Sequence, residues 1–160
     1  MSSMRNWYLI KTKSRQEHVA IENLENQKYS TYCPTITIKN KHIVLFPGYL
    51  FIHLDKEREN WSPIRSTKGV VNFVRFGLNF AQVPDTVIEF LKANQLINKE
   101  KLINLNKFKS GEKVKIIDGV FKNCIAIFES SKPDERVILL MNLLGQQQAI
   151  NIKQKSVISL

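Results

Sequence analysis

The feature that most constrains the fold is an apolar run at residues 44–54, interrupted by the pair Pro47-Gly48. After this pair the chain continues with six residues, mostly of types that favour strands. The run is too short to cross a membrane, so it predicts a strand buried in a sheet. Its aromatic residues Phe46, Tyr49 and Phe51 are either core residues or part of an exposed surface that docks another protein.

The charge of the chain predicts an anionic partner. There are 24 Lys and Arg residues against 14 Asp and Glu residues, a formal net charge of +10. Residues 1–16, 28–54 and 60–80 contain no acid at all. If these basic stretches share a face, that face is the expected binding site for a polyanion, with nucleic acid ahead of an acidic membrane surface.

Several classes of protein are disfavoured by the residues that are missing. Cys33 and Cys124 are far apart in sequence, which excludes a disulfide framework and a four-cysteine zinc site. No segment is typical of a signal peptide or long enough to span a membrane, so with the cysteine pattern we expect a reduced, cytoplasmic protein without a membrane partner. We also expect a monomer. The three histidines show no catalytic or metal-binding spacing, and there is no Gly-rich phosphate loop. We therefore expect neither an enzyme nor a cofactor or metal.

The order of elements in residues 1–97 predicts an α+β domain. Ser14 and Glu17 match a capping box at the start of the first helix. A polar stretch at residues 39–42 predicts a hairpin with a basic tip, and Pro34 favours an edge strand. The predicted strands cover residues 7–10, 30–38, 43–54 and 69–77, and the predicted helices cover 15–28, 57–66 and 86–91.

Residues 98–109 are rich in Asn and Lys and predict a linker before a small C-terminal domain at 110–160. The sequence of this domain fits two structures. Its apolar residues fall at helical spacing in two stretches, which are Phe121, Cys124, Ile125, Phe128 and Val137, Leu140, Met141, Leu144. Residues 121–129 and 136–144 fit two strands around a turn at 131–134 equally well. A helical hairpin and a β-barrel both remain open.

Four motifs in order resemble the NusG family of transcription elongation factors. They are Trp7-Tyr8-Leu9, Phe46-Pro47-Gly48-Tyr49-Leu50-Phe51, Thr67-Lys68-Gly69-Val70-Val71-Asn72-Phe73-Val74, and Gly111-Glu112-Lys113-Val114 with Asp118-Gly119-Val120-Phe121. The family combines an α+β N-terminal domain, an antiparallel sheet flanked by helices, with a C-terminal KOW barrel. The Leu-rich stretch at 139–144, with residues 73–77 and 126–128, is most similar to the specialised branch typified by RfaH.

The resemblance implies a function and its partners. It implies an operon-specific elongation and antitermination factor that binds the clamp helices of RNA polymerase. The matching polymerase-binding residues are Phe46, Tyr49, Phe51, Val70 and Phe76. A general NusG factor and a basic KOW protein associated with ribosomes or RNA are the alternatives.

The specialised branch also implies a DNA contact and a change of fold. Residues matching its contacts to the single-stranded non-template DNA are Lys13, Ser14, Gln16, Asn23, Thr67 and Lys68. A helical C-terminal domain would cover the polymerase site through the interdomain residues Arg136, Phe121, Phe128 and Leu140. On release it would become a barrel that recruits a protein of the small ribosomal subunit, with Leu144 as a contact.

Overall fold

The structure, a computed structural model, describes residues 5–94 and 119–158. Its central sheet has the strand order β2-β5-β1-β6, and β9 pairs with the first half of β1, before the residues that pair with β6. The strands are β1 (Asn6–Thr12), β2 (Ser30–Tyr32), β5 (Tyr49–Leu54), β6 (Val70–Phe73) and β9 (Gln82–Val83). All of these pairings are antiparallel, and Leu9 of β1 lies opposite Phe51 of β5. The predicted antiparallel α+β domain is therefore confirmed.

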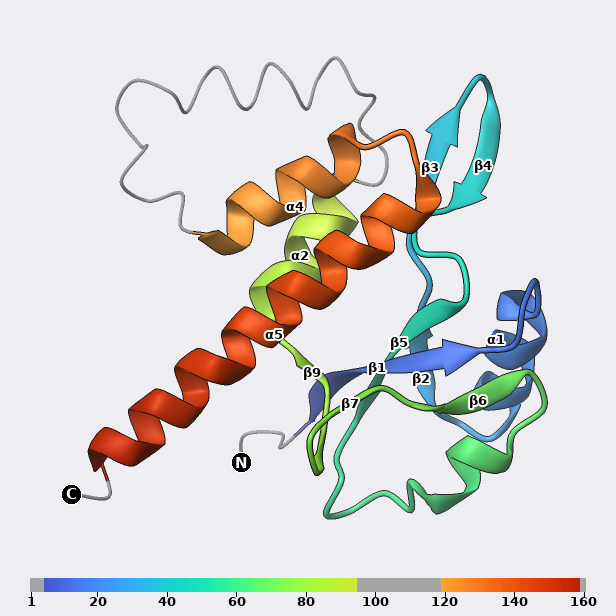
Figure 1. Cartoon of the computed structure of the whole chain (residues 1–160). Coiled ribbons are helices and arrows are strands. Elements are labelled where there is room, and N and C mark those ends of the chain that lie inside the picture. The colour runs from blue at the N-terminus through green and yellow to red at the C-terminus, as the bar shows by residue number, and fades with distance from the viewer. Residues whose placement is uncertain (1–4, 95–118, 159–160) are drawn as a thin grey trace.

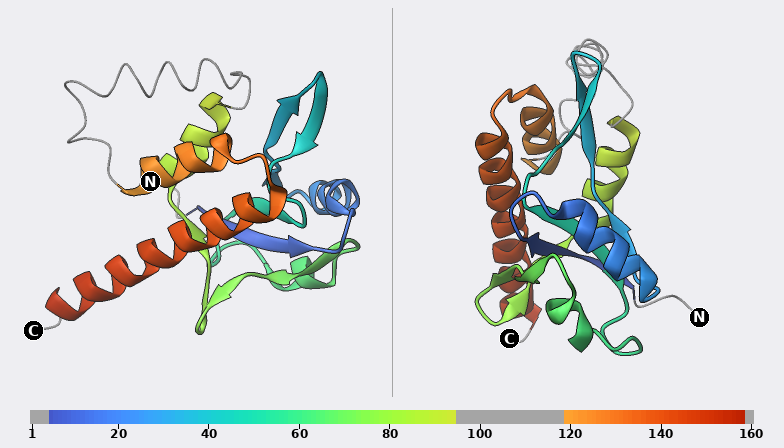
Figure 2. Two further views of the ribbon diagram at one scale, coloured as in Figure 1. Left: turned by 45° about the horizontal axis from the view of Figure 1, so that its top comes forward. Right: turned by 90° about the vertical axis from the view of Figure 1, so that its right-hand side faces the viewer.

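The alternation of side chains along β1 and β5 creates two buried faces. Tyr8, Ile10 and their neighbours on β5 pack with Ala20 and Leu24 of helix α1 (Glu17–Asn26). Leu9 points to the opposite face, where three helices cover the sheet (Figures 1 and 2). These helices are α2 (Asp85–Asn94), α4 (Gly119–Glu129) and α5 (Pro133–Ile158).

The long strands predicted at 30–38 and 43–54 are each broken in two. The chain leaves the sheet after Tyr32 and forms a separate hairpin of β3 (Thr35–Ile38) and β4 (Lys41–Val44) before entering β5. Its turn is only Lys39-Asn40, whose φ angles of 51° and 64° fit a two-residue hairpin turn. The hairpin projects from the sheet in Figure 1. The first predicted strand breaks at Pro34 and the second at the Pro47-Gly48 pair. A proline has no N–H group to donate to the hydrogen-bond ladder between strands.

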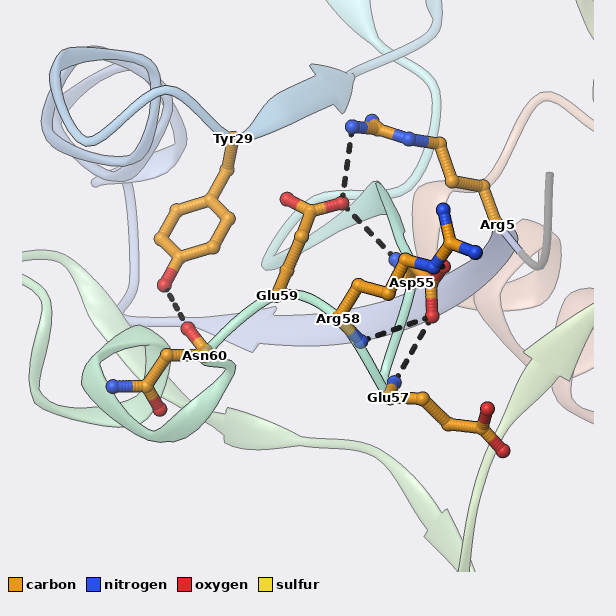
Figure 3. Close-up of polar contacts among 7 residues, drawn as sticks. All are labelled: Arg5, Tyr29, Asp55, Glu57, Arg58, Glu59 and Asn60. Atoms are coloured by element: carbon orange, nitrogen blue, oxygen red, sulfur yellow. Dashed lines mark hydrogen bonds and ion pairs between the residues drawn. The ribbon is translucent and has the colours of Figure 1, made fainter.

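The strand and helix predicted between residues 57 and 77 are also shorter than expected. The strand splits into β6 and β7 (Arg75–Phe76), and β7 pairs with β8 (Asn79–Phe80). The helix is reduced to the 3₁₀ segment η1 (Ser62–Ser66). The preceding turn is held by the Asp55 carboxylate, which accepts bonds from the N–H groups of Glu57 (3.0 Å) and Arg58 (3.2 Å) (Figure 3). Glu59 pairs with Arg5 at 3.2 Å.

The capping box predicted from Ser14 and Glu17 is wrong. Helix α1 begins at Glu17 with Gln16 as its N-cap and with no side-chain cap. The chain turns sharply before it, with a φ of 59° at Arg15, so Ser14 lies outside the helix. Glu17 instead accepts a hydrogen bond of 2.7 Å from the N–H of Gly48. This bond ties the start of α1 to the loop between β4 and β5.

The described part of the C-terminal segment is a helical hairpin, the first of the two structures that the sequence allowed. Helices α4 and α5 are joined by residues 130–132 and pack against each other. The C-terminal part of α5 extends beyond the sheet in Figure 1. The linker predicted at 98–109 and the Gly111-Glu112-Lys113-Val114 motif lie outside the described residues.

None of the helices within 5–94 and 119–158 combines the length and the apolar composition that a membrane span requires.

Candidate functional site

Four of the five residues predicted to bind polymerase lie together on one face of the sheet. Phe46 and Phe51 are 1% and 0% exposed and meet edge to face, with ring centroids 6.1 Å apart. Tyr49 and Phe76 pack around them and are partly exposed. We call these four residues the docking face. Val70 is not part of it, because its side chain lies in the other apolar cluster, under α1.

The docking face is covered by the C-terminal helices. They add side chains to the same apolar cluster, which are Cys124, Ile127 and Phe128 from α4 and Leu140, Leu143 and Leu144 from α5. The ring of Phe128 lies 6.2 Å from that of Phe90 on α2. Phe46 and Phe51 are thus buried in a cluster that includes a segment following them by more than 70 positions, whereas Tyr49 and Phe76 stay partly exposed. The side chain of Phe121 lies outside the described part.

One buried cation joins the helical hairpin to the docking face. Arg136 of α5 is 1% exposed, and its Nε donates a hydrogen bond of 2.8 Å to the carbonyl oxygen of Leu45. Its Nη1 donates to the carbonyl oxygen of Ser130, at 3.1 Å, at the turn between the helices. Burial lowers the pKa of Arg136. The ion pairs found among the described residues do not include Arg136, so backbone carbonyls compensate its charge.

Leu45 takes part in the contact between the helical hairpin and the docking face, and the sequence analysis missed it. Its side chain is an ordinary core leucine, 0% exposed, in the same cluster as Phe46. Its role at the interface belongs to its carbonyl oxygen, and every residue has one. No pattern of side chains could have identified it, although the position of Arg136 was predicted.

The exposed residues of the predicted DNA surface lie at the corner between β1 and α1. Lys13, Ser14 and Lys68 are exposed, and Gln16 is half-buried. The N–H of Lys13 donates a hydrogen bond of 2.8 Å to the carbonyl oxygen of Gly69, which brings this corner beside Lys68. Two lysines from distant parts of the chain therefore lie at one surface, an arrangement that suits phosphate groups.

Two other predicted DNA contacts are bonded within the protein. Thr67 is 7% exposed, and its hydroxyl donates to the carbonyl oxygen of Pro63 and accepts from Nε2 of Gln27, each at 2.9 Å. The Asn23 side chain donates to the carbonyl oxygen of Val19 at 2.7 Å, along its own helix. These bonds orient the corner, whereas Lys13 and Lys68 present charge to solvent.

Comparisons with known proteins show which family this chain resembles. A family model described as transcription termination factor nusG matches residues 5–92. The transcription termination/antitermination protein NusG of Chlamydia trachomatis is 25% identical over 92% of this chain and 91% of its own length. That of Helicobacter pylori is 29% identical over 96% of this chain and 98% of its own. A solved structure, titled as domain interaction in Thermotoga maritima NusG, has a TM-score of 0.46 and 25% identity, covering 54% of this chain and 55% of that one.

Proposed function

This chain belongs to the NusG family, and on that premise we propose that it is a transcription elongation and antitermination factor that binds RNA polymerase through the docking face. The observation that carries the proposal is the apolar cluster that Phe46, Tyr49, Phe51 and Phe76 share with the chain's own C-terminal helices. An apolar face of this kind is typical of a protein-binding surface. The helices occupy it in place of the partner, so binding requires their release.

We propose further that the chain acts as an operon-specific factor of the RfaH type. The helical form of the C-terminal segment supports this, because a KOW barrel would not place Leu140 and Leu144 on the docking face in this way. In this function Lys13, Ser14, Gln16 and Lys68 contact the single-stranded non-template DNA. After release, the C-terminal segment refolds into a barrel, and Leu144 becomes able to contact a small-subunit ribosomal protein.

A general NusG factor is the second candidate. The curated relatives carry the general name, and the matches extend over more than nine tenths of this chain. A general factor binds polymerase without requiring a DNA element. Binding to transcription complexes assembled on random and on pause-site scaffolds separates the two functions. Equal binding to both scaffolds would support the general factor and contradict the specialised one.

Polymerase binding itself is tested by pull-down of the full-length chain with purified RNA polymerase. Tyr49→Ala and Phe76→Ala each truncate a partly exposed ring of the docking face, and we expect each to weaken binding about tenfold. Leu78→Ala is the matched control, since Leu78 is 94% exposed two residues after Phe76.

The same pull-down is repeated in an Arg136→Ala background, in which the hairpin is released more readily. We expect this background to bind more polymerase than the wild type and to remain sensitive to the two ring substitutions. If the ring variants bind as well as the wild type in both backgrounds, the docking face is not the polymerase site.

A further inference from the structure

A cavity of about 670 Å³ opens between the start of α1 and the loop that joins β4 to β5. Residues of α4 and α5 do not line it, so the helical hairpin leaves it accessible. Ser14 and Tyr49 are the only residues it shares with the predicted DNA and polymerase surfaces. A volume of this size accommodates a small organic molecule or one nucleotide.

The cavity combines an apolar wall with a cationic rim. Tyr49 and Pro47 belong to the wall, and Lys11, Arg15 and His42 supply positive charge or hydrogen-bond donors. These three side chains are exposed. An apolar wall beside cations favours a ligand that carries both an anionic group and a planar or apolar body.

Thr12 provides a second and independent sign of a ligand. It lines the cavity, is 3% exposed, and its Oγ1 is buried without a hydrogen-bond partner. Its backbone N–H is used, donating to the carbonyl oxygen of Gly48 at 2.8 Å. A buried hydroxyl without a partner is unfavourable, and a ligand group that bonds it removes this cost.

Glu17 decides which kind of anion fits. Its side chain is 7% exposed and lines the cavity, and one carboxylate oxygen accepts the bond from Gly48. A carboxylate repels a bare phosphate but accepts hydrogen bonds from amino or imino groups. Lys11 and Arg15, which also line the cavity, supply the positive charge that a phosphate needs. A nucleotide combines a phosphate with a planar base that donates such bonds.

We propose that this cavity binds one nucleotide of a single-stranded nucleic acid, with its phosphate near Lys11 and Arg15 and its base against Tyr49, within reach of Thr12 and Glu17. The inference rests on the nucleic-acid contact of the proposed function and extends it to a cavity that shares Ser14 with the predicted DNA surface.

The test is binding of a fluorescein-labelled single-stranded decadeoxynucleotide to the full chain, measured by anisotropy without polymerase. Thr12→Val removes the unpaired hydroxyl without changing the charge. We expect a three- to tenfold loss of affinity, an unchanged salt dependence and an unfolding midpoint no lower than that of the wild type. Arg15→Gln should lower affinity to a similar extent and reduce the salt slope by about one. Lys122→Gln on α4, also exposed, is the charge-matched control and should change affinity less than twofold.

Competition identifies the ligand. Nucleoside monophosphates should compete with the oligonucleotide better than inorganic phosphate does, and the oligonucleotide should bind more tightly than either. Wild-type affinity in both Thr12→Val and Arg15→Gln would overturn the proposal, as would the absence of oligonucleotide binding. If inorganic phosphate competes as well as the nucleoside monophosphates do, the cavity is only an anion site and the proposal is wrong. If a free mononucleotide binds more tightly than the oligonucleotide, a single-stranded nucleic acid is excluded as the ligand. Polymerase binding by the Phe76→Ala variant, which does not involve this cavity, tests the proposed function separately.

Discussion

Nε of Arg136 lies 2.8 Å from the carbonyl oxygen of Leu45, so a buried charge on α5 is bonded to the backbone beside Phe46. The acceptor is a neutral carbonyl, and the same guanidinium also bonds Ser130 at the turn of the helical hairpin. One side chain therefore stabilises the hairpin and its docking at the same time.

Arg136→Ala should release the helical hairpin more often. The substitution removes both hydrogen bonds and leaves the Leu45 carbonyl unpaired, which costs about 2–3 kcal/mol. Cys124 of α4 is 0% exposed and reports the release through its reaction with a thiol reagent. We expect the labelling rate to rise at least about tenfold. Burial raises the pKa of Cys33 to about 11, so that thiol reacts slowly and serves as an internal reference. An unchanged Cys124 rate would contradict the role of Arg136.

Salt should not open the hairpin. An interface held by an ion pair weakens as salt screens the two charges. Here the partner of Arg136 on the docking side is a carbonyl, and the cluster formed by the described side chains of the two helices and the sheet is apolar. Raising NaCl from about 0.05 to 1 M is therefore expected to leave the Cys124 labelling rate unchanged or slower. A clear acceleration at high salt would reveal an ionic interface.

Gly145→Ala should stabilise the helical form of the C-terminal segment. Gly145 lies within α5, where glycine costs about 1 kcal/mol relative to alanine. A Cβ at this position would lie 3.9 Å from Cε1 of Phe76, an ordinary contact. We expect slower Cys124 labelling and weaker polymerase binding. Asn142→Ala, at an exposed position of the same helix, should have a similar but smaller effect, because it too favours the helix. Faster labelling in Gly145→Ala would show that the glycine is needed for packing.

Gly69→Ala should destabilise the N-terminal domain far more than Gly77→Ala. Both glycines have positive φ, 91° and 64°, so alanine is strained at either position by about 1–2 kcal/mol. Only Gly69 is also crowded, since its added Cβ would lie 2.7 Å from the backbone nitrogen of Ala20. Urea unfolding should show a loss at least about 1 kcal/mol larger for Gly69→Ala. Equal losses would show that α1 can move away from β6.

The stability of the protein should fall as pH drops below about 6.5. Burial, and then the positive charge of Arg5, lower the pKa of His53 from its ordinary 6.5, and its ring stacks on Trp7 at 4.5 Å. The unfolded chain then binds the proton more readily. The stability that neutral His53 contributes is therefore fully present above the pKa of this group in the unfolded chain. It is lost as the pH falls toward the lower pKa of His53 in the folded protein. Urea unfolding at pH 7.5 and 5.5 should show this dependence in the wild type and in His42→Gln but not in His53→Gln.

The sheet and its two faces could be predicted from the sequence because successive side chains of a strand always point to opposite faces. Leu9 and Phe51 fall on one face, and Tyr8 and Ile52 on the other, as the pattern requires. The hydrogen-bond partners of individual polar side chains were harder to predict. Ser14 and Glu17 suit a capping box, yet the carboxylate bonds Gly48 instead. Thr67 suits a nucleic-acid contact, yet its hydroxyl is used within the protein. Such polar groups have several acceptable partners, and sequence alone does not choose among them.

The sequence by itself determined that residues 121–144 carry apolar side chains at a spacing that suits a helix as well as a strand. Only the tertiary structure decided between them. As helices, the segment places Phe128, Leu140 and Leu144 together against Phe46 and Phe51, which lie far away in sequence. Local preferences differ by about 1 kcal/mol or less per residue, whereas burying each such side chain contributes about 1.5–3 kcal/mol. The surface available for burial therefore selects the fold of the segment.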